Sequence, residues 1–250
     1  MGHGAAEQAR VITMPGVESG VRLLVINADD FGHARGANEG ILEAHRNGIV
    51  TSTSLMVFGP AAEEAARLAR KHSNLSVGLH FAADADVDLD DAAATARAFA
   101  RQLERFRELM GADPTHVDSH HHEHMPAHRM PRFAELVAPL GVPLRGAGVR
   151  YIGGFYGQWE PGVTNLEHVR RAYLIHVIAT EALVGFSELA CHPARITSDF
   201  TSSYLHERAV ELQTLTEPGL REEIEALGVR LVSYHDWAAP ATGATPGAGT

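Results

Sequence analysis

The chain has 250 residues, of which 45% are hydrophobic and 21% are charged, and its formal net charge at pH 7 is −10. This length suits one large globular domain with a substantial core, whereas the acidic balance is opposite to what a nucleic-acid or anionic-membrane surface requires. The single cysteine, Cys191, rules out an internal disulfide framework. No apolar stretch approaches the roughly 20 residues of a membrane span. We therefore expect a cytoplasmic protein that binds neither nucleic acid nor membranes.

The two ends of the chain differ from its central part. Residues 1–21 show no clear hydrophobic period, and we expect them to form an irregular arm. Residues 238–250 contain only Ala, Gly, Pro and Thr, a low-complexity tail that cannot bury enough apolar surface to become ordered. Residues 22–237 contain no linker and no internal repeat, so we expect a single domain there.

Short apolar runs alternate with longer helical patterns along this central part. The predicted strands are 22–27, 52–57, 75–80, 115–120, 142–145, 188–191 and 230–234. The predicted helices are 37–46, 61–71, 90–110, 129–138, 166–183, 206–215 and 219–227. This alternation predicts a parallel sheet. About seven such units in one run favour a closed or nearly closed α/β barrel over an open sheet.

Acidic and histidine residues recur at the carboxyl ends of the predicted strands: Asp29 and Asp30 after the first, His80 on the third, Asp118 and His120 on the fourth, and His192 after the sixth. In a parallel α/β barrel these strand ends share one rim, which carries the active site. Residues that are far apart in the sequence are therefore expected to converge on one cleft.

Asp30, His80 and His120 together form a set of two histidines and one carboxylate, which leaves coordination positions open for water and substrate. Each has an ordinary alternative role, because an Asp-Asp pair can cap a helix and a lone strand-end histidine is more often a core residue. Their combination predicts one catalytic divalent metal ion, zinc or magnesium, and histidine ligands favour zinc. His121, His122 and His124 cannot all bind the same ion. We expect them to form an adventitious metal-binding tract on a loop or to bind substrate.

Several further residues suit proton transfer or orientation. Adjacent carboxylates point to opposite faces of a regular strand, so we expect the chain to turn at Asp29 and Asp30. With Asp30 in the ligand set, its neighbour Asp29 is the candidate base. His192 is the candidate acid for an amine leaving group. Asp118 shares a strand face with His120 and can hold an imidazole in its ligating tautomer. Arg145 ends a strand and either pairs with Asp29, keeping it ionised, or forms an ordinary salt bridge.

The segment 151–159 is rich in glycine and aromatic residues, in a chain with only 6% aromatic residues. Apolar ring faces beside polar groups suit one side of a sugar. Tyr156 and Trp159 are therefore candidate substrate-binding residues, although the segment could equally form a dimer contact.

The ordered motifs resemble those of the YdjC family, which includes chitooligosaccharide deacetylases. The residues that carry the resemblance are 27–32 (Asn-Ala-Asp-Asp-Phe-Gly), 78–81 (Gly-Leu-His-Phe), 115–122 (Thr-His-Val-Asp-Ser-His-His-His) and 191–193 (Cys-His-Pro). The match runs from about Arg22 to Trp237, and four motifs in the same order are far more specific than any one of them. It also takes in residues 47–53 and a carboxyl-terminal pattern of Arg208, Glu211, Leu212 and Leu215.

The resemblance implies a distorted α/β barrel related to polysaccharide deacetylases. It implies a divalent metal, magnesium or zinc, bound by Asp30, His80 and His120. It also implies Asp29 as the base and His192 as the acid or carbonyl-contacting group. The expected reaction removes an acetyl or other acyl group from the nitrogen of an amino sugar or a glycoconjugate. A homodimer is a family-level expectation.

Three departures from the family pattern border the expected cleft. Residues 82–89 are short and acidic where the family often has a long loop, Ala194-Arg195 follows His-Pro in place of glycine, and Glu123 replaces a common apolar residue. The specific substrate therefore stays open, and a shorter loop could admit a bulkier acceptor.

Two other functions are consistent with the residues alone. The first is metal-dependent hydrolysis of a phosphoester or cyclic amide, which the scarcity of Lys and Arg near the motifs disfavours. The second is non-catalytic metal or sugar binding, which the Asp-Asp pair disfavours because binding alone needs no base.

Overall fold

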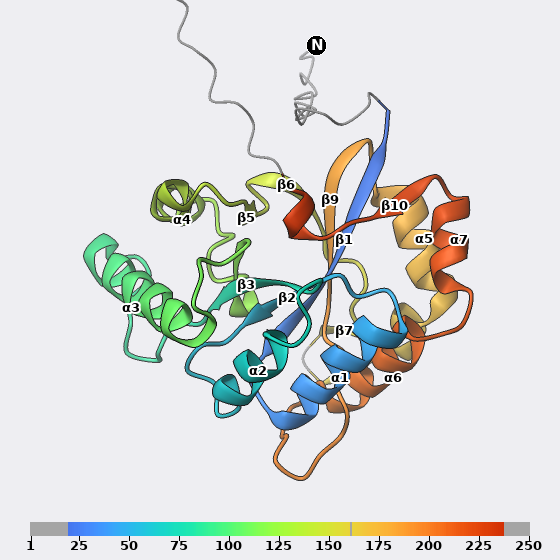
Figure 1. Ribbon diagram of the computed structural model, residues 1–250, viewed down its shortest axis with the longest axis horizontal. Helices are drawn as coiled ribbons and strands as arrows, with labels where there is room; N and C mark the ends of the chain where they lie inside the picture. Colours follow the sequence, from blue (N-terminus) through green and yellow to red (C-terminus); the bar gives the residue numbers. More distant parts are fainter. Residues whose placement is uncertain (1–19, 161, 238–250) are drawn as a thin grey trace, which may run out of the picture.

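The computed structural model describes residues 20–160 and 162–237, which form an α/β barrel with helices around it (Figure 1). The alternation of strands and helices in the sequence predicted this class of fold. The predicted tail and nearly all of the predicted amino-terminal arm lie outside the described residues. None of the helices within the described ranges combines the length and apolar character that a membrane span requires.

Seven parallel strands close the barrel in the order β1 (Arg22–Phe31), β2 (Ser52–Leu55), β3 (Ser76–Phe81), β4 (Val117–Ser119), β5 (Leu144–Arg145), β6 (Gly148–Ile152) and β9 (Gly185–Cys191). The ring closes where β9 pairs with β1, from Arg22 opposite Gly185 to Ala28 opposite Cys191. On its other edge, β1 pairs first with β10 (Val229–Leu231) and then with β2.

One of the seven strands of the closed ring, β6, was not predicted from the sequence. The sequence indicated residues 230–234, but β10 is shorter and joins only the first part of β1. Its place is taken by β6, whose exposed and buried residues alternate. A half-exposed strand lacks the continuous apolar run that marks a strand buried on both faces. Strands β7 (Gln158–Glu160) and β8 (Val163–Thr164), which form a small antiparallel hairpin, were not predicted either.

The helices lie on the outside of the barrel: α1 (Arg35–Asn47), α2 (Ala62–Ala69), α3 (Ala92–Met110), α4 (Met130–Val137), α5 (Arg171–Glu181), α6 (Leu205–Leu215) and α7 (Leu220–Ala226). Short 3-10 turns occupy His120–His122, Ala138–Leu140, Leu166–Val169 and Tyr234–Asp236. The helix predicted over 166–183 is divided, because Arg170 is extended (φ −93°, ψ 159°) between the turn and α5.

One face of β1 changes from apolar to polar along its length, and this change determines at which end of the barrel the polar site lies. Leu23 and Val25 pack in a small apolar cluster with Tyr234. Asn27 and Asp29 follow on the same face, and Asn27 Nδ2 donates to Asp29 Oδ1 over 2.8 Å. The alternate residues of β1 join the large apolar cluster between strands and helices. The polar half of this face therefore lies at the carboxyl ends of the strands.

Two glycines of α1 let the segment after β9 approach the helix closely. A Cβ on Gly36 would lie 2.2 Å from the carbonyl oxygen of Arg195, and one on Gly40 would lie 2.4 Å from Ala194 Cα. Neither distance is sterically possible, so glycine is required at both positions. This packing fixes the chain just beyond His192.

Candidate active site

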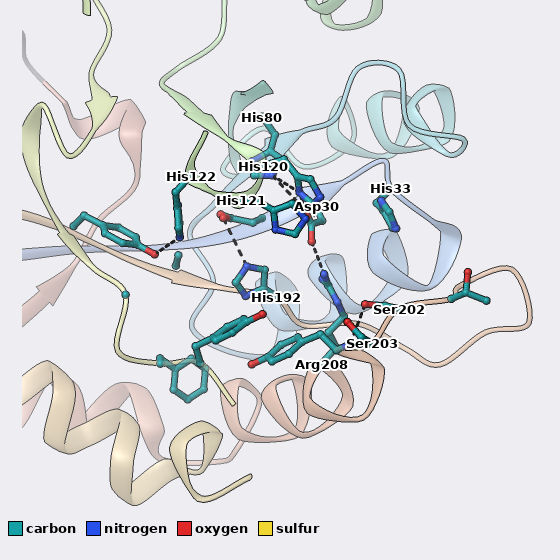
Figure 2. A pocket seen from close by; sticks show the side chains of 18 residues that line it. Asp30, His33, His80, His120, His121, His122, His192, Ser202, Ser203 and Arg208 are labelled. Atoms are coloured by element: carbon teal, nitrogen blue, oxygen red, sulfur yellow. Dashed lines mark hydrogen bonds and ion pairs between the residues drawn. The ribbon is translucent and has the colours of Figure 1, made fainter. Parts of the chain in front are cut away.

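A cavity of about 550 Å³ lies at the carboxyl ends of the barrel strands (Figure 2). All five residues predicted to bind metal or to move protons line it: Asp29, Asp30, His80, His120 and His192. The structure thus brings these residues together from four strand ends, as expected for a parallel barrel.

Three side chains direct one ligand atom each toward a common point. Asp30 Oδ1 lies 3.2 Å from His80 Nε2 and 3.1 Å from His120 Nδ1. The two imidazole nitrogens are 3.4 Å apart. Two ring nitrogens and a carboxylate oxygen that converge in this way can hold one metal ion.

A bulge in β1 allows both adjacent aspartates to reach the cavity. The pairing of β1 with β2 shifts register between Ala28 and Phe31, and Asp30 has a φ of +67°. This left-handed conformation is strained for a residue other than glycine and is characteristic of functional sites. The sequence predicted that the chain must turn here; the structure achieves the change of direction inside the strand, which continues to Phe31.

Asp118 lies behind His80 and orients its ring. The Asp118 carboxylate is 2.7 Å from His80 Nδ1 and also accepts a hydrogen bond from Ser54 Oγ. With Nδ1 bonded in this way, His80 presents Nε2 to the cavity. Burial disfavours the imidazolium, but the carboxylates of Asp118 and Asp30 raise the pKa of His80 to about 10. The same negative charge would stabilise a metal cation at Nε2.

Arg145 is fully enclosed and pairs with Asp29, as one of the two sequence interpretations proposed. Its Nη1 and Nη2 donate to the two oxygens of Asp29 over 2.7 and 2.6 Å, and the guanidinium also contacts Asp118 and Glu188. Burial opposes ionisation of Asp29, but the adjacent guanidinium outweighs it and lowers the pKa of Asp29 below its ordinary value. Asp29 is therefore an anion at neutral pH and can accept a proton.

His192 lines the cavity close to Asp29. Its Nε2 is 3.8 Å from Asp29 Oδ2, and its backbone N–H donates to the buried carboxylate of Glu211 over 2.5 Å. The rings of Tyr156 and Tyr204 stack on each other with centroids 4.3 Å apart, and both meet the imidazole edge-on. The histidine is thereby held between a carboxylate and an aromatic wall.

Sequence reasoning did not assign three residues of this site. Arg208 Nη2 donates to Asp30 Oδ2 over 2.5 Å, and Tyr204 and Glu211 support His192. The three follow one another at spacings of four and three residues, which places them on one face at the start of α6. Arg208 and Glu211 belong to the carboxyl-terminal part of the matched family pattern, and this is the signal that could have revealed them.

Three predicted site residues do not line the cavity. Asp118 and Arg145 lie behind it and contact His80 and Asp29, whereas Trp159 lies on the β7–β8 hairpin. Its side chain is 60% exposed, and its Nε1 donates to His168 Nδ1 over 2.5 Å. The β7–β8 hairpin directs the indole toward this neighbour, whereas Tyr156, just before the hairpin, faces the cavity. Glu123, Ala194, Arg195 and residues 82–89, all expected at the cleft, are also absent from its lining. Glu123 instead accepts from the backbone of Ala83.

Comparisons with known proteins find similar proteins over most of the chain. The model of the YdjC-like protein family matches residues 23–226. A carbohydrate deacetylase of Geobacillus stearothermophilus is 35% identical, over 86% of this chain and 98% of that protein. A chitooligosaccharide deacetylase of Escherichia fergusonii is 34% identical, over 86% of this chain and 99% of that protein.

Two solved structures have a similar fold. A candidate cellobiose-phosphate cleavage protein of Enterococcus faecalis V583 superposes with a TM-score of 0.72, at 24% identity, covering 86% of this chain and 98% of that one. The catalytic domain of a peptidoglycan N-acetylglucosamine deacetylase of Eubacterium rectale superposes with a TM-score of 0.55, at 14% identity, covering 89% and 92%. The predicted relation of the barrel to polysaccharide deacetylases is confirmed at the level of the fold.

Proposed function

Because this chain belongs to the YdjC-like protein family, we propose that it is a metal-dependent hydrolase that removes an acetyl or other acyl group from the nitrogen of an amino sugar or an amino-sugar glycoconjugate. The products are a carboxylate, acetate for an acetyl group, and a free amine. The convergence of Asp30, His80 and His120 beside the Asp29–Arg145 pair is the observation that carries the proposal. The names of the curated relatives support the same reaction class.

The donor set fits a divalent cation. Asp30 offers one oxygen, because its other oxygen is engaged by Arg208, and His80 and His120 offer one nitrogen each. A cation held there would polarise the amide carbonyl and lower the pKa of water in the cavity. We propose zinc or magnesium as the metal, and the two imidazole ligands favour zinc because they are softer donors than oxygen.

Asp29 and His192 divide the proton transfers between them. Asp29, held ionised by Arg145, accepts a proton from the attacking water as the oxygen–carbon bond forms. His192 donates a proton to the amide nitrogen as the carbon–nitrogen bond breaks. Their facing atoms are 3.8 Å apart, so both side chains can contact the same reacting amide.

The shape and lining of the cavity suit a sugar. The stacked Tyr156 and Tyr204 provide an aromatic wall, and the hydroxyl-bearing residues 201–203 add polar groups beside it. Arg208 is the only Lys or Arg among the described residues of the lining, and a single guanidinium does not balance the two charges of a phosphate dianion. This disfavours the phosphoester alternative. The homodimer implied by the family stays a prediction.

Acetate release from a panel of N-acetyl amino sugars and chitooligosaccharides tests the proposed function. We expect the metal-loaded protein to release acetate and an equal amount of free amine from at least one member, and the chelator-treated protein to release none. A protein that holds stoichiometric metal yet releases no acetate from any member would contradict the proposal.

A further inference from the structure

Arg208 is a buried cation in the cavity wall whose position the metal ligands and proton-transfer groups do not explain. It projects from α6, and only 7% of its surface is exposed. Figure 2 shows its guanidinium reaching Asp30 from the side opposite His80 and His120. No other Arg or Lys lines the cavity in the ranges that the structure describes. Among the described residues of the lining, Arg208 is therefore the permanently positive side chain that an anion formed in the cavity can contact.

The guanidinium has more donors than Asp30 uses. Arginine carries five N–H donors in a planar fork, and Nη2 bonds to Asp30 Oδ2. Nε is buried, and none of the described residues accepts its hydrogen bond. The rings of Phe200 and Tyr204 lie 5.3 and 5.8 Å from the guanidinium carbon and pack beside it. The side chain is thus held in place by aromatic contacts and one carboxylate oxygen.

Asp30 joins this guanidinium to the metal site. Its Oδ1 faces His80 and His120, and its Oδ2 faces Arg208. The guanidinium of Arg208 is therefore separated from the atoms that would hold the metal only by the carboxylate group of Asp30, and it lies on the wall of the same cavity.

The proposed reaction generates negative charge in this place. As water oxygen bonds to the acyl carbon, the electron pair of the carbonyl π bond moves onto the carbonyl oxygen. When the carbon–nitrogen bond breaks, its electron pair leaves with the nitrogen, which takes a proton from His192. The electron pair on the acyl oxygen re-forms the carbonyl bond as the amine departs, and the acid product loses the remaining water proton to solvent. The acyl product then carries one negative charge shared between two oxygens, and the fork of an arginine matches a carboxylate in geometry.

We propose that Arg208 is a further catalytic residue, which stabilises the charge that develops on the acyl oxygen and then binds the carboxylate product. This inference rests on the proposed function and extends it. The competing role is positioning alone, in which Arg208 would only hold Asp30 for the metal. The two roles differ because positioning acts on metal affinity, whereas contact with the acyl oxygens acts on kcat and on acetate affinity even when the metal is saturating.

The test compares Arg208→Gln and Arg208→Lys with wild type and with the control Arg195→Gln, which removes an exposed guanidinium paired with Glu43. Calorimetry gives the metal affinity of the metal-free proteins and the acetate affinity of the metal-loaded proteins, and kcat is measured at saturating metal. For Arg208→Gln we expect kcat to fall about 10²-fold, the scale of losing one donor to a developing oxyanion, and acetate to bind at least about 10-fold more weakly. The kcat and the acetate affinity of Arg208→Lys should lie between those of wild type and Arg208→Gln, because lysine keeps the positive charge but lacks the planar fork of donors.

The proposal is overturned if Arg208→Gln regains the wild-type kcat at saturating metal, if it binds acetate as tightly as wild type, or if wild type binds no acetate. Arg195→Gln should match wild type in all measurements. If circular dichroism shows that Arg208→Gln does not fold, the test uses Arg208→Lys. An acetate affinity of Arg208→Lys equal to that of wild type then overturns the proposal. If wild type releases no acetate from any N-acetyl sugar, the proposed function fails, but direct acetate binding still tests Arg208.

Discussion

The two walls of the cavity are built in different ways. On the proposed metal-binding wall, Asp30 and His80 extend from β1 and β3, and Asp118 of β4 lies behind His80; all three are buried. On the facing wall, Tyr156 belongs to the loop after β6, and residues 201–204 precede α6. The first wall is fixed by strand pairing and a network of charged hydrogen bonds, and the second by loop packing and ring stacking.

The difference predicts how each wall responds to substitution. Reacting groups must be held within about 0.5 Å of their working geometry, which strand ends with supporting hydrogen bonds provide better than loops. Side chains on loops contact parts of the substrate that do not react, so their loss weakens ground state and transition state alike. We therefore expect large effects on chemistry from the metal-binding wall and small effects on substrate affinity from the facing wall.

The largest expected effect is that of His80→Ala on the metal-binding wall. Its Nε2 is one of the three converging ligand atoms, so the variant should lose stoichiometric metal and with it all measurable activity. His121→Ala, on the neighbouring exposed turn, should keep its metal. Elemental analysis after dialysis against chelator measures both, and a normal metal content in His80→Ala would show that the assigned ligand set is wrong.

Asp29→Asn should separate proton transfer from metal binding on the same wall. The amide keeps the shape of the side chain but cannot accept the proton, so kcat should fall at least about 10²-fold while metal content stays normal. Rates and metal content are measured on one preparation. Loss of metal together with activity would mean that the roles of Asp29 and Asp30 are exchanged.

Asp118→Asn tests the support behind the ligands. It weakens the contact that holds His80 Nδ1, and such second contacts typically change metal affinity about 10- to 100-fold. A competition titration with a chromophoric chelator gives the affinity. An unchanged value would mean that strand geometry alone orients the imidazole.

The smallest effect is expected from the facing wall. Tyr156→Leu should raise KM several-fold with little change in kcat, consistent with losing roughly 1 kcal/mol of aromatic contact. Trp159→Ala, whose indole lies outside the cavity lining, should change KM for a monosaccharide substrate less than Tyr156→Leu does. The reverse order would restore the role that the sequence suggested for Trp159.

The sequence predicts the metal-binding wall well because that wall follows from a few general rules. Parallel strands in a barrel end at one rim, so Asp30, His80 and His120 could be grouped from their positions after apolar runs. The bulge at Asp30 could not be predicted in detail, because pairing with β2 rather than the local sequence determines the register shift. The sequence correctly predicted that the chain changes direction at the two aspartates, but the change is a bulge inside β1 and not a turn that ends the strand.

The facing wall is less predictable because its path depends on tertiary packing. Tyr156 and Trp159 are three residues apart in similar local sequence, yet only Tyr156 lines the cavity. The direction of the β7–β8 hairpin depends on contacts with distant residues, such as the hydrogen bond from Gln158 to Glu207. Arg208 was missed for a related reason, since nothing in the sequence of α6 alone shows that its first turns reach Asp30.

The pairing of β1 with β9 also determines when the site can exist during synthesis. Asp29 lies near the start of the described chain, but its partner Arg145 and its neighbour His192 are made more than 100 residues later. Until β9 leaves the ribosome, the edge of β1 that will pair with it is open, and unpaired strand edges invite association with other chains. A nascent chain of this protein therefore carries its two aspartates on an incomplete barrel, and its binding centre forms only when nearly the whole sequence has been translated.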